Sequence, residues 1–565
     1  MRILPLLVAC ALLCMTIALS AAGGPTKSAG TAARTYVVVY AKDASLAQAR
    51  AAVRAAGGRI MKENKAVGVA TVRTGNANFV RQADAQAALD GAAADRPIGY
   101  SKPALRPKAD EAKLDLLLSR ARAEERAGGR SHHEGGRSEP LADLQWNMQM
   151  LDATKEGSYG KERGSHHVLV GIIDTGIDAS HPDLRANFNH RLSRNFTTDI
   201  PLIDGPCADE PDQSCSDPAD VDEGGHGTHV AGIVGAAING LGVSGVAPNV
   251  SLVNLRGGQD SGYFFLQESV DALTYAGNHG IDVVNMSYYI DPWLFNCADN
   301  PADSPDEQAQ QRTVVEATQR ALDYAHRHGV TLVSALGNDH TDLGNPTVDD
   351  TSPDFPPGTA HHRTVNNSCL DLPTEGRHVI GVSALGPTET KADYSNWGTE
   401  QTNVSAPGGF FRDFVGTPQF MTPGNLVLST YPKALAREEG LIDEDGNPTD
   451  DFTIKDCRGS TCGIYEYLQG TSMASPHVTG VAALIVSKYG HWRHGDFGLN
   501  PDRVKRILYK TAVDHACPTP RLFDYGPYGR DDSYDAYCAG SPRFNGFYGQ
   551  GIVNALNAVT HRHHH

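Results

Sequence analysis

The sequence predicts an α/β domain built on a mostly parallel sheet, preceded by a small α+β unit. From about residue 141, short apolar runs alternate with segments of helical periodicity. The apolar runs are residues 168–173, 250–255, 281–286, 330–336 and 379–382. The helical patterns are residues 226–238, 266–279, 313–329, 472–489 and 501–511. Continuous apolar strands that alternate with helices are typical of a parallel sheet covered on both faces.

The first residues have the order of a secretory signal peptide. A basic start, Met1-Arg2, precedes an apolar run over residues 3–19, and small residues follow up to position 22. A membrane anchor is the alternative, since the run is near the lower length limit for spanning. We expect a cleaved signal over residues 1–22 and, after cleavage, no attachment to a membrane.

Two segments separate this start from the α/β domain. Residues 35–100 contain a strand pattern at 36–40 and an Ala-rich helical pattern at 45–56, without cysteines or a catalytic cluster. Residues 101–140 are rich in Lys, Arg, Glu, Ala and Gly, which is typical of an exposed, protease-sensitive connector. The sequence therefore predicts a small α+β domain, a connector, and a large domain over residues 141–560.

Charge and composition exclude some classes of function. The chain has 66 acidic and 49 basic side chains and a net charge of −17, whereas a nucleic-acid binder needs a basic face. Hydrophobic residues make up 40% of the chain, which indicates a globular protein rather than a disordered one. We expect no nucleic-acid partner and a monomer.

Four polar residues lie where strands end or helices begin, the positions that carry function in such sheets. Asp174 follows an apolar run and either orients a histidine or caps a turn. His226 stands among small residues, and its pairing with His229 is a weak metal signal without Glu or Cys. Ser472 begins a helical pattern as a nucleophile or an ordinary N-cap, and Asn338 could donate to an oxyanion.

Taken together, these residues indicate nucleophilic catalysis. A serine needs a base to become a nucleophile, and the base needs a third group to set its tautomer. The chain order Asp174, His226, Ser472 excludes an α/β-hydrolase, in which the serine comes first.

The motifs around these residues resemble those of subtilisin-like serine proteases, the subtilases. The matching segments are 171–178, 181–184, 226–232 and 470–477, with support at 245–248, 284–287, 337–338, 405–408 and 548–551. They extend over about residues 145–560. The resemblance implies a subtilisin-like three-layer sandwich with a mostly parallel central sheet.

The resemblance also implies the function and its residues. Ser472 would attack the peptide carbonyl, His226 would transfer the proton, Asp174 would orient His226, and Asn338 would stabilise the oxyanion. The protein is then a secreted serine endopeptidase that acts through an acyl-enzyme on protein or peptide substrates.

In subtilases an N-terminal domain like residues 35–100 is an inhibitor and folding chaperone that self-cleavage removes. Residues 101–140 would then hold the maturation site, and the pro-domain would be an intramolecular partner. The alternative from another class is a catalytically silent subtilase fold that serves as a binding protein.

Two segments are similar to the strands that hold substrate in this family. They are Ser287, Tyr288 and Tyr289 on one side and Ala335, Leu336 and Gly337 on the other. The family has small glycines where Tyr289 stands. Its bulk either reshapes the walls of the cleft or points to solvent, so a specificity copied from subtilisin does not follow.

The segment before His226 carries many acidic side chains between residues 199 and 223. Such a run is either a solvated loop or a field that favours basic substrate residues near the cleft.

Calcium is the cofactor that the resemblance implies. Residues 237–243 are similar to the family's strong calcium loop, and hard cations prefer several oxygen ligands. Asp183 and Asn239 would supply side-chain oxygens, while Ala237, Leu241 and Val243 would supply carbonyl oxygens. Asp143, in the N-terminal arm, would complete the shell. The alternative is a plain Gly-Asn turn.

Two of the ten cysteines belong to the predicted signal peptide. The other eight permit 105 pairings. Closeness in sequence favours Cys207–Cys215, Cys457–Cys462 and Cys517–Cys538, which leaves Cys297–Cys369. Four disulfides indicate an oxidising compartment and hence an extracellular protein.

Overall fold

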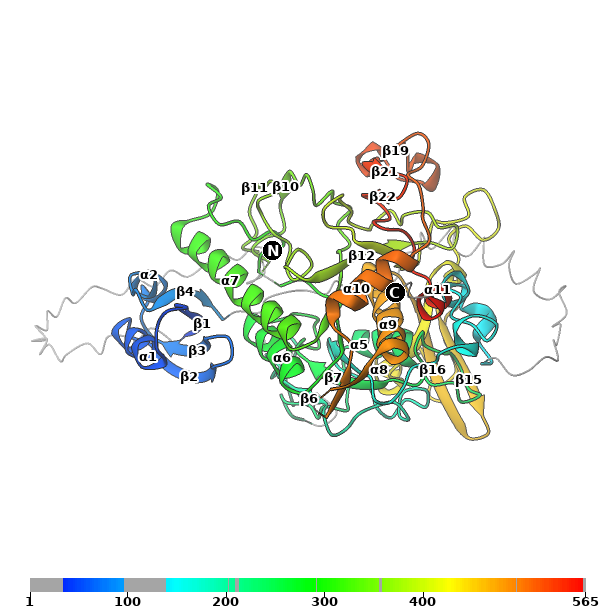
Figure 1. Cartoon of the computed structure of the whole chain (residues 1–565), viewed down its shortest axis with the longest axis horizontal. Coiled ribbons are helices and arrows are strands. Elements are labelled where there is room, and N and C mark those ends of the chain that lie inside the picture. The colour runs from blue at the N-terminus through cyan, green and yellow to red at the C-terminus, as the bar shows by residue number, and fades with distance from the viewer. Residues whose placement is uncertain are drawn as a thin grey trace, which may run out of the picture.

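The computed structural model describes residues 34–95 and 139–561, apart from positions 202, 209–212, 291, 355–357 and 494. A small N-terminal α+β domain precedes a larger α/β domain, as the sequence predicts (Figure 1). The predicted signal peptide and residues 101–138 of the predicted connector lie outside the described residues. Within the described ranges, we find no helix with the length and apolar character needed to cross a bilayer.

The small domain is a four-stranded antiparallel sheet with two helices. Its elements are β1 (Arg34–Tyr40), α1 (Leu46–Ala55), β2 (Arg59–Asn64), β3 (Val69–Thr74), α2 (Phe79–Asp84) and β4 (Leu89–Ala94). The strand order is β2-β3-β1-β4. Ser45 and Gln48 form a capping box that starts α1.

Alternate residues of β1 belong to two different cores, because successive side chains of a strand point to opposite faces. Tyr36, Val38 and Tyr40 pack with the helices of the small domain. Val37 and Val39 instead belong to a hydrophobic cluster of the larger domain. One face of the small sheet is therefore covered by the larger domain.

The larger domain contains a seven-stranded sheet in which neighbouring strands run parallel. Its order is β13 (Val404–Pro407), β12 (Val379–Leu385), β9 (Thr331–Ala335), β8 (Val283–Met286), β5 (Leu169–Ile173), β7 (Ser251–Arg256) and β6 (Arg194–Asn195). Each of the five predicted apolar runs overlaps one of these strands. The central strands β8 and β9 are buried at every position because helices cover both faces of the sheet.

Helices form the two outer layers. One core packs α5 (His226–Gly235), α9 (Thr471–Tyr489), α10 (Pro501–Thr511) and α11 (Ala555–Thr560) against the sheet. The other packs α6 (Leu266–Asn278) and α7 (Pro305–Arg327), which lie beside the small domain (Figure 1). The three-layer prediction is confirmed.

Helix α7 begins eight residues before the predicted helical pattern at 313. Ser304 and Glu307 form a capping box there, and Pro305 occupies the first helical position. These local signals, rather than apolar periodicity, mark the start of the helix.

Several elements outside the main sheet were not predicted. The largest is an antiparallel sheet of β14 (Val427–Tyr431), β16 (Thr461–Leu468) and β15 (Thr453–Arg458). The short helices are α4 (Trp146–Met150) and α8 (Lys433–Glu438). The short strand pairs are β10 (Val348–Asp349) with β11 (Arg363–Thr364), β17 (His491–Arg493) with β18 (Asp496–Gly498), β19 (Leu522–Phe523) with β20 (Ala536–Tyr537), and β21 (Gly540–Ser541) with β22 (Phe544–Asn545).

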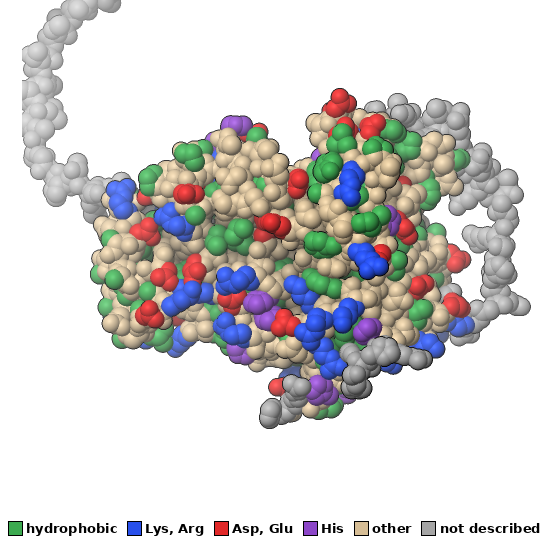
Figure 2. Space-filling model, turned by 45° about the horizontal axis from the view of Figure 1, so that its top comes forward, with side chains coloured by type: hydrophobic (Ala, Val, Ile, Leu, Met, Phe, Trp, Pro, Cys, Tyr) green, Lys and Arg blue, Asp and Glu red, His purple; other side chains and the backbone are tan. Residues whose placement is uncertain are grey.

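The surface is not uniformly acidic despite the net charge of −17. Figure 2 shows a face on which Lys and Arg side chains gather beside acidic ones. Part of the negative charge is inside the protein, as the sites below show.

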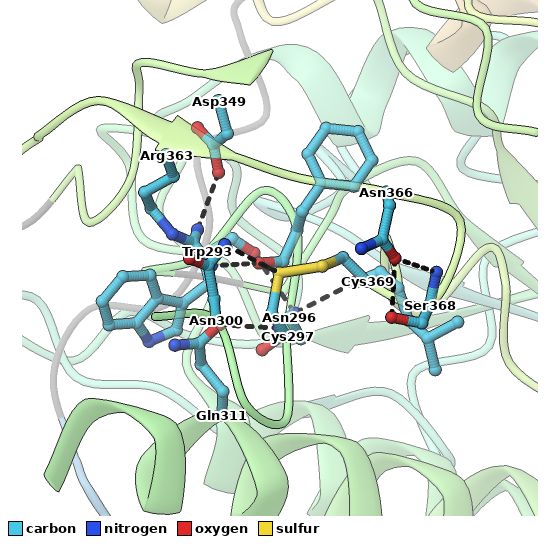
Figure 3. Close-up of a disulfide and its surroundings, with 12 residues drawn as sticks. Trp293, Asn296, Cys297, Asn300, Gln311, Asp349, Arg363, Asn366, Ser368 and Cys369 are labelled. Carbon is cyan, nitrogen blue, oxygen red and sulfur yellow. Dashed lines mark hydrogen bonds and ion pairs between the residues drawn. A yellow bond between two sulfur atoms is a disulfide. The ribbon is translucent and has the colours of Figure 1, made fainter. Parts of the chain in front are cut away.

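All four predicted disulfides are confirmed. Cys297–Cys369 ties the segment before α7 to the segment before β12 (Figure 3). Beside it the buried guanidinium of Arg363 pairs with Asp349 at 2.8 Å and with Asp303 at 3.0 Å. This part of the loop region is therefore fixed by a covalent bond and a buried ion-pair network.

We expect loss of Cys297–Cys369 to destabilise the protein more than loss of a short-range disulfide. With 72 residues between the cysteines, the chain-entropy relation gives about 4 kcal/mol for the double Cys→Ser variant. The matched control removes Cys207–Cys215, separated by 8 residues, for which the relation gives about 2.5 kcal/mol. Denaturant unfolding measures both, and equal losses would contradict the expectation.

Candidate active site

Asp174 and His226 meet at the end of β5, next to the central strand of the sheet. Asp174 follows β5 and is fully buried, and His226 is the first residue of α5. The Nδ1–H of His226 donates to Asp174 Oδ1 at 2.6 Å, and the same oxygen accepts from the Thr175 N–H at 2.8 Å. A buried carboxylate bonded to Nδ1 holds the other imidazole nitrogen, Nε2, in the form that accepts a proton.

The pKa of His226 is raised above its ordinary value. Burial opposes the imidazolium charge, but the adjacent negative charge of Asp174 and its hydrogen bond outweigh that effect. Asp222 adds a smaller contribution in the same direction. The pair is therefore arranged to stabilise a proton on His226 once it has been accepted.

Asp222 fixes the start of α5 against the end of β5. Its Oδ2 accepts from the Thr228 N–H at 2.9 Å, and its Oδ1 accepts from the Gly225 N–H at 2.9 Å and from the Thr175 hydroxyl at 3.0 Å. The sequence analysis placed Asp222 in an acidic run and missed this role. The signal that could have found it is an acidic residue shortly before the helical pattern that begins at His226, where the N–H groups of the first helical turn need acceptors.

Ser472 and Asn338 come together from α9 and from the end of β9. The Ser472 hydroxyl donates to the Ser287 carbonyl at 3.3 Å. Asn338 Oδ1 accepts from both the N–H and the hydroxyl of Thr471 at 2.9 Å. Because its oxygen is occupied, the NH₂ group of Asn338 is the part of the amide left to donate to a substrate.

A cavity lies beside Ser472 and Asn338. Five of the six predicted substrate-binding residues line it, namely Ser287, Tyr288, Tyr289, Ala335 and Gly337. The sixth, Leu336, is instead buried in a cluster with Phe295 and Leu343. Thr471, Asp339 and Asp371 also line the cavity, and the sequence analysis identified none of them.

The predicted calcium loop surrounds a buried carboxylate. Asp183 accepts from Asn239 Nδ2 at 2.9 Å, from the Val243 N–H at 3.2 Å and from the Tyr465 hydroxyl at 2.8 Å. Burial raises the pKa of Asp183 to about 7. The N-terminal arm reaches this loop through Glu139, whose Oε2 accepts from the Gly240 N–H at 2.7 Å.

A second acidic cluster joins the segment before His226 to the segment that follows β7. Asp199, Asp217 and Asp260 place carboxylate oxygens within 4.8 Å of one another and could hold a metal ion such as Ca²⁺. The guanidinium of Arg256 contacts all three carboxylates, at 2.8 Å for Asp199 and 2.9 Å for Asp260. Burial raises the pKa of Asp260 to about 8. Asp199 and Asp217, which belong to the acidic run, are therefore buried rather than part of a solvated loop.

The sequence pattern of the subtilase family matches residues 165–551, and the chain belongs to that family. Its class is subtilisin-like serine endopeptidase. The chain is 29% identical to subtilisin DY of Bacillus licheniformis, over 65% of this chain and 91% of the relative. It is 27% identical to the nisin leader peptide-processing serine protease NisP of Lactococcus lactis subsp. lactis, over 76% of this chain and 55% of the relative.

Solved structures support the fold. The epidermin leader peptide processing serine protease EpiP of Staphylococcus aureus superposes with a TM-score of 0.60 at 20% identity, covering 94% of this chain and 99% of that chain. At that identity the likeness shows the subtilisin fold alone. It extends over the small N-terminal domain as well, because nearly the whole chain is covered.

We expect peptide hydrolysis to decrease as the pH falls, with a midpoint above about 6.5, the ordinary pKa of histidine. His226 must be neutral to accept a proton, and its raised pKa moves protonation to higher pH. The measurement is the acid limb of the kcat/KM–pH profile.

The variant Asp174→Asn should lower the midpoint of that limb, because it removes the negative charge that raises the pKa of His226. It should also reduce kcat by about 10⁴-fold. An unchanged midpoint in Asp174→Asn would show that Asp174 does not set the pKa of His226.

Proposed function

We propose that the protein is a secreted serine endopeptidase, made as a zymogen that processes itself. The observation that carries the proposal is the buried 2.6 Å contact between Asp174 and His226, in a chain whose Ser472 and Asn338 line one cavity. A base held by a carboxylate, a nucleophile and an amide donor make up the machinery of acyl transfer.

In the proposed mechanism the Ser472 hydroxyl turns from the Ser287 carbonyl toward His226 and attacks the peptide carbonyl. His226 Nε2 takes the proton, and Asp174 stabilises the resulting imidazolium. The Asn338 NH₂ group and the Ser472 N–H donate to the oxyanion. His226 then protonates the leaving amine, and a water molecule activated by the same base hydrolyses the acyl-enzyme.

The small domain is proposed to be the inhibitor and chaperone, with the maturation site in residues 101–140. In support, its sheet shares a hydrophobic cluster with α6 and α7. Asn64 Nδ2 donates to Asp271 at 2.8 Å, and Arg320 donates to the Tyr40 carbonyl at 2.7 Å. Relatives named for cleaving leader peptides support protein or peptide substrates for this enzyme also.

Secretion is supported by the predicted signal over residues 1–22 and by the disulfides. Four disulfides persist in an oxidising environment and are rare where thiols are kept reduced.

We further propose a structural calcium ion at the loop 237–243. The residues fit a hard cation, since Asp183 and Glu139 are both acidic and face the same loop, and the charge of Glu139 adds to the burial that raises the pKa of Asp183. Asp183 and Asn239 would supply side-chain oxygens, and Ala237, Leu241 and Val243 would supply carbonyl oxygens. The ion would lock the loop against the N-terminal arm.

We expect Ser472→Ala to accumulate as an unprocessed precursor and to lose about 10⁶-fold in turnover. The readouts are the size of the secreted chain and hydrolysis of casein. Maturation of the purified variant without other proteases would contradict the assignment.

A fluorophosphonate label separates the enzyme from a catalytically silent binding protein, because only an activated serine reacts. The mature protein should label at Ser472, and Ser472→Ala should not. An intact, folded parent protein that fails to label would favour the silent binding protein.

We expect a chelator to lower the melting temperature of the mature protein by several degrees. At a free Ca²⁺ concentration of about 1,000 times Kd, binding contributes about 4 kcal/mol. Asp183→Asn should abolish most of the difference between scans with and without EDTA, whereas Asp217→Asn should retain it. The reverse outcome would place the calcium at the aspartate cluster around Arg256, and indifference of the parent to EDTA would remove both sites.

A further inference from the structure

The cavity beside Ser472 is where the side chain preceding the scissile bond must enter. Ser472 supplies the attacking oxygen and Asn338 the oxyanion donor, and both lie on its wall. When the substrate carbonyl sits between these two groups, the side chain of that residue, P1, has the cavity beside it. The lining of the cavity therefore selects the P1 residue.

The wall of this cavity contains a buried acidic residue, Asp371. Its side chain is 2% exposed, and its Oδ1 is buried without a hydrogen-bond partner among the described residues. No Lys, Arg or His of the described chain forms an ion pair with it, and none lines the cavity. Burying a carboxylate without a counter-charge costs several kcal/mol, and in the described part of the chain Oδ1 of Asp371 has no hydrogen bond that would offset this cost.

The charges around Asp371 are also negative. Asp339 lines the same cavity, and Glu375 accepts from the Asp371 N–H at 2.7 Å. Burial, together with the charges of Glu375 and Asp339, raises the pKa of Asp371 well above its usual range. Burial likewise raises the pKa of Glu375 to about 7. A cation entering the cavity would relieve this repulsion, and an anion would add to it.

The backbone holds Asp371 in place from both sides. Leu370 exchanges two hydrogen bonds with Asn296, at 2.9 and 3.0 Å, and the Ile290 N–H donates to the Leu372 carbonyl at 2.6 Å. The Cys297–Cys369 disulfide lies two residues before Asp371 (Figure 3). The carboxylate is therefore presented by a fixed segment, which reduces the ordering cost of binding.

We propose that Asp371 determines specificity and that the preferred substrates carry Arg or Lys at P1. The inference rests on the proposed endopeptidase function and names its substrate class. The P1 guanidinium or ammonium pairs with the Asp371 carboxylate inside the cavity, where a charge-assisted hydrogen bond is strong. Asp339 adds to the negative field at the same wall.

The test uses the mature enzyme and peptides that differ only at P1, with Arg, Lys, Leu, Phe or Glu. The parent should give its highest kcat/KM with Arg or Lys and its lowest with Glu. In Asp371→Asn, the ratio of kcat/KM for Arg to that for Leu should fall on the order of 100-fold. Asp339→Asn should lower the same ratio by less, because that side chain is only partly buried.

Glu375→Gln is the matched control. It neutralises a neighbouring, partly buried carboxylate that does not line the cavity, and the order of P1 preference should stay as in the parent. A parent that prefers Leu or Phe, or an Asp371→Asn variant with the parent's ratio, would overturn the proposal and leave Asp371 a protonated structural group. A larger effect from Asp339→Asn than from Asp371→Asn would also overturn it.

Fluorophosphonate labelling keeps this outcome separate from failure of the proposed function. If the enzyme labels at Ser472 but ranks apolar P1 residues first, only the specificity inference fails. If it neither labels nor cleaves any of the peptides, the endopeptidase function fails.

Discussion

The buried carboxylate of Asp174 is the constraint on which the arrangement of the catalytic domain depends. A fully buried charge between two apolar cores is expensive unless it is paired and hydrogen-bonded. Its partners come from its own strand end, through Thr175, and from α5, through His226, 52 positions further along the chain. The end of strand β5 and the start of helix α5 must therefore pack in one relative orientation. Asp222 stabilises that orientation through hydrogen bonds to both segments.

The parallel sheet brings the remaining groups to the same edge. Asp174, Ser287 and Asn338 follow β5, β8 and β9, which are neighbours in the sheet, and the carboxyl ends of parallel strands share one edge. Ser472 enters from α9, whose residues are almost all buried between the sheet and the outer helices. A helix packed so completely cannot shift without opening a cavity, so Ser472 is held in place by the core itself.

Sequence reasoning predicted what depends on local pattern. Apolar runs located five sheet strands, short motifs located Asp174, His226, Ser472 and Asn338, and closeness in sequence located the disulfides. Sequence reasoning missed the roles that depend on burial, because the sequence does not show whether a charged side chain lies in the interior or on the surface. Asp222 stood among the acidic side chains of residues 199–223, and no sequence pattern pointed to Asp371. Only the fold shows that Asp222 bonds to the start of α5 and that Asp371 lines a cavity. The antiparallel sheet β14–β16 was missed because no strand pattern was identified in residues 427–468.

The division of β1 between two cores has a consequence for temperature. Val37 and Val39 stay out of water only while the small domain lies on α6 and α7, so the two domains share part of their hydrophobic stabilisation. Apolar contacts weaken on cooling, whereas the polar contacts at the rim of this surface do not share that dependence. Cooling therefore weakens the apolar centre of the interface between the two domains. Warming within the stable range strengthens it.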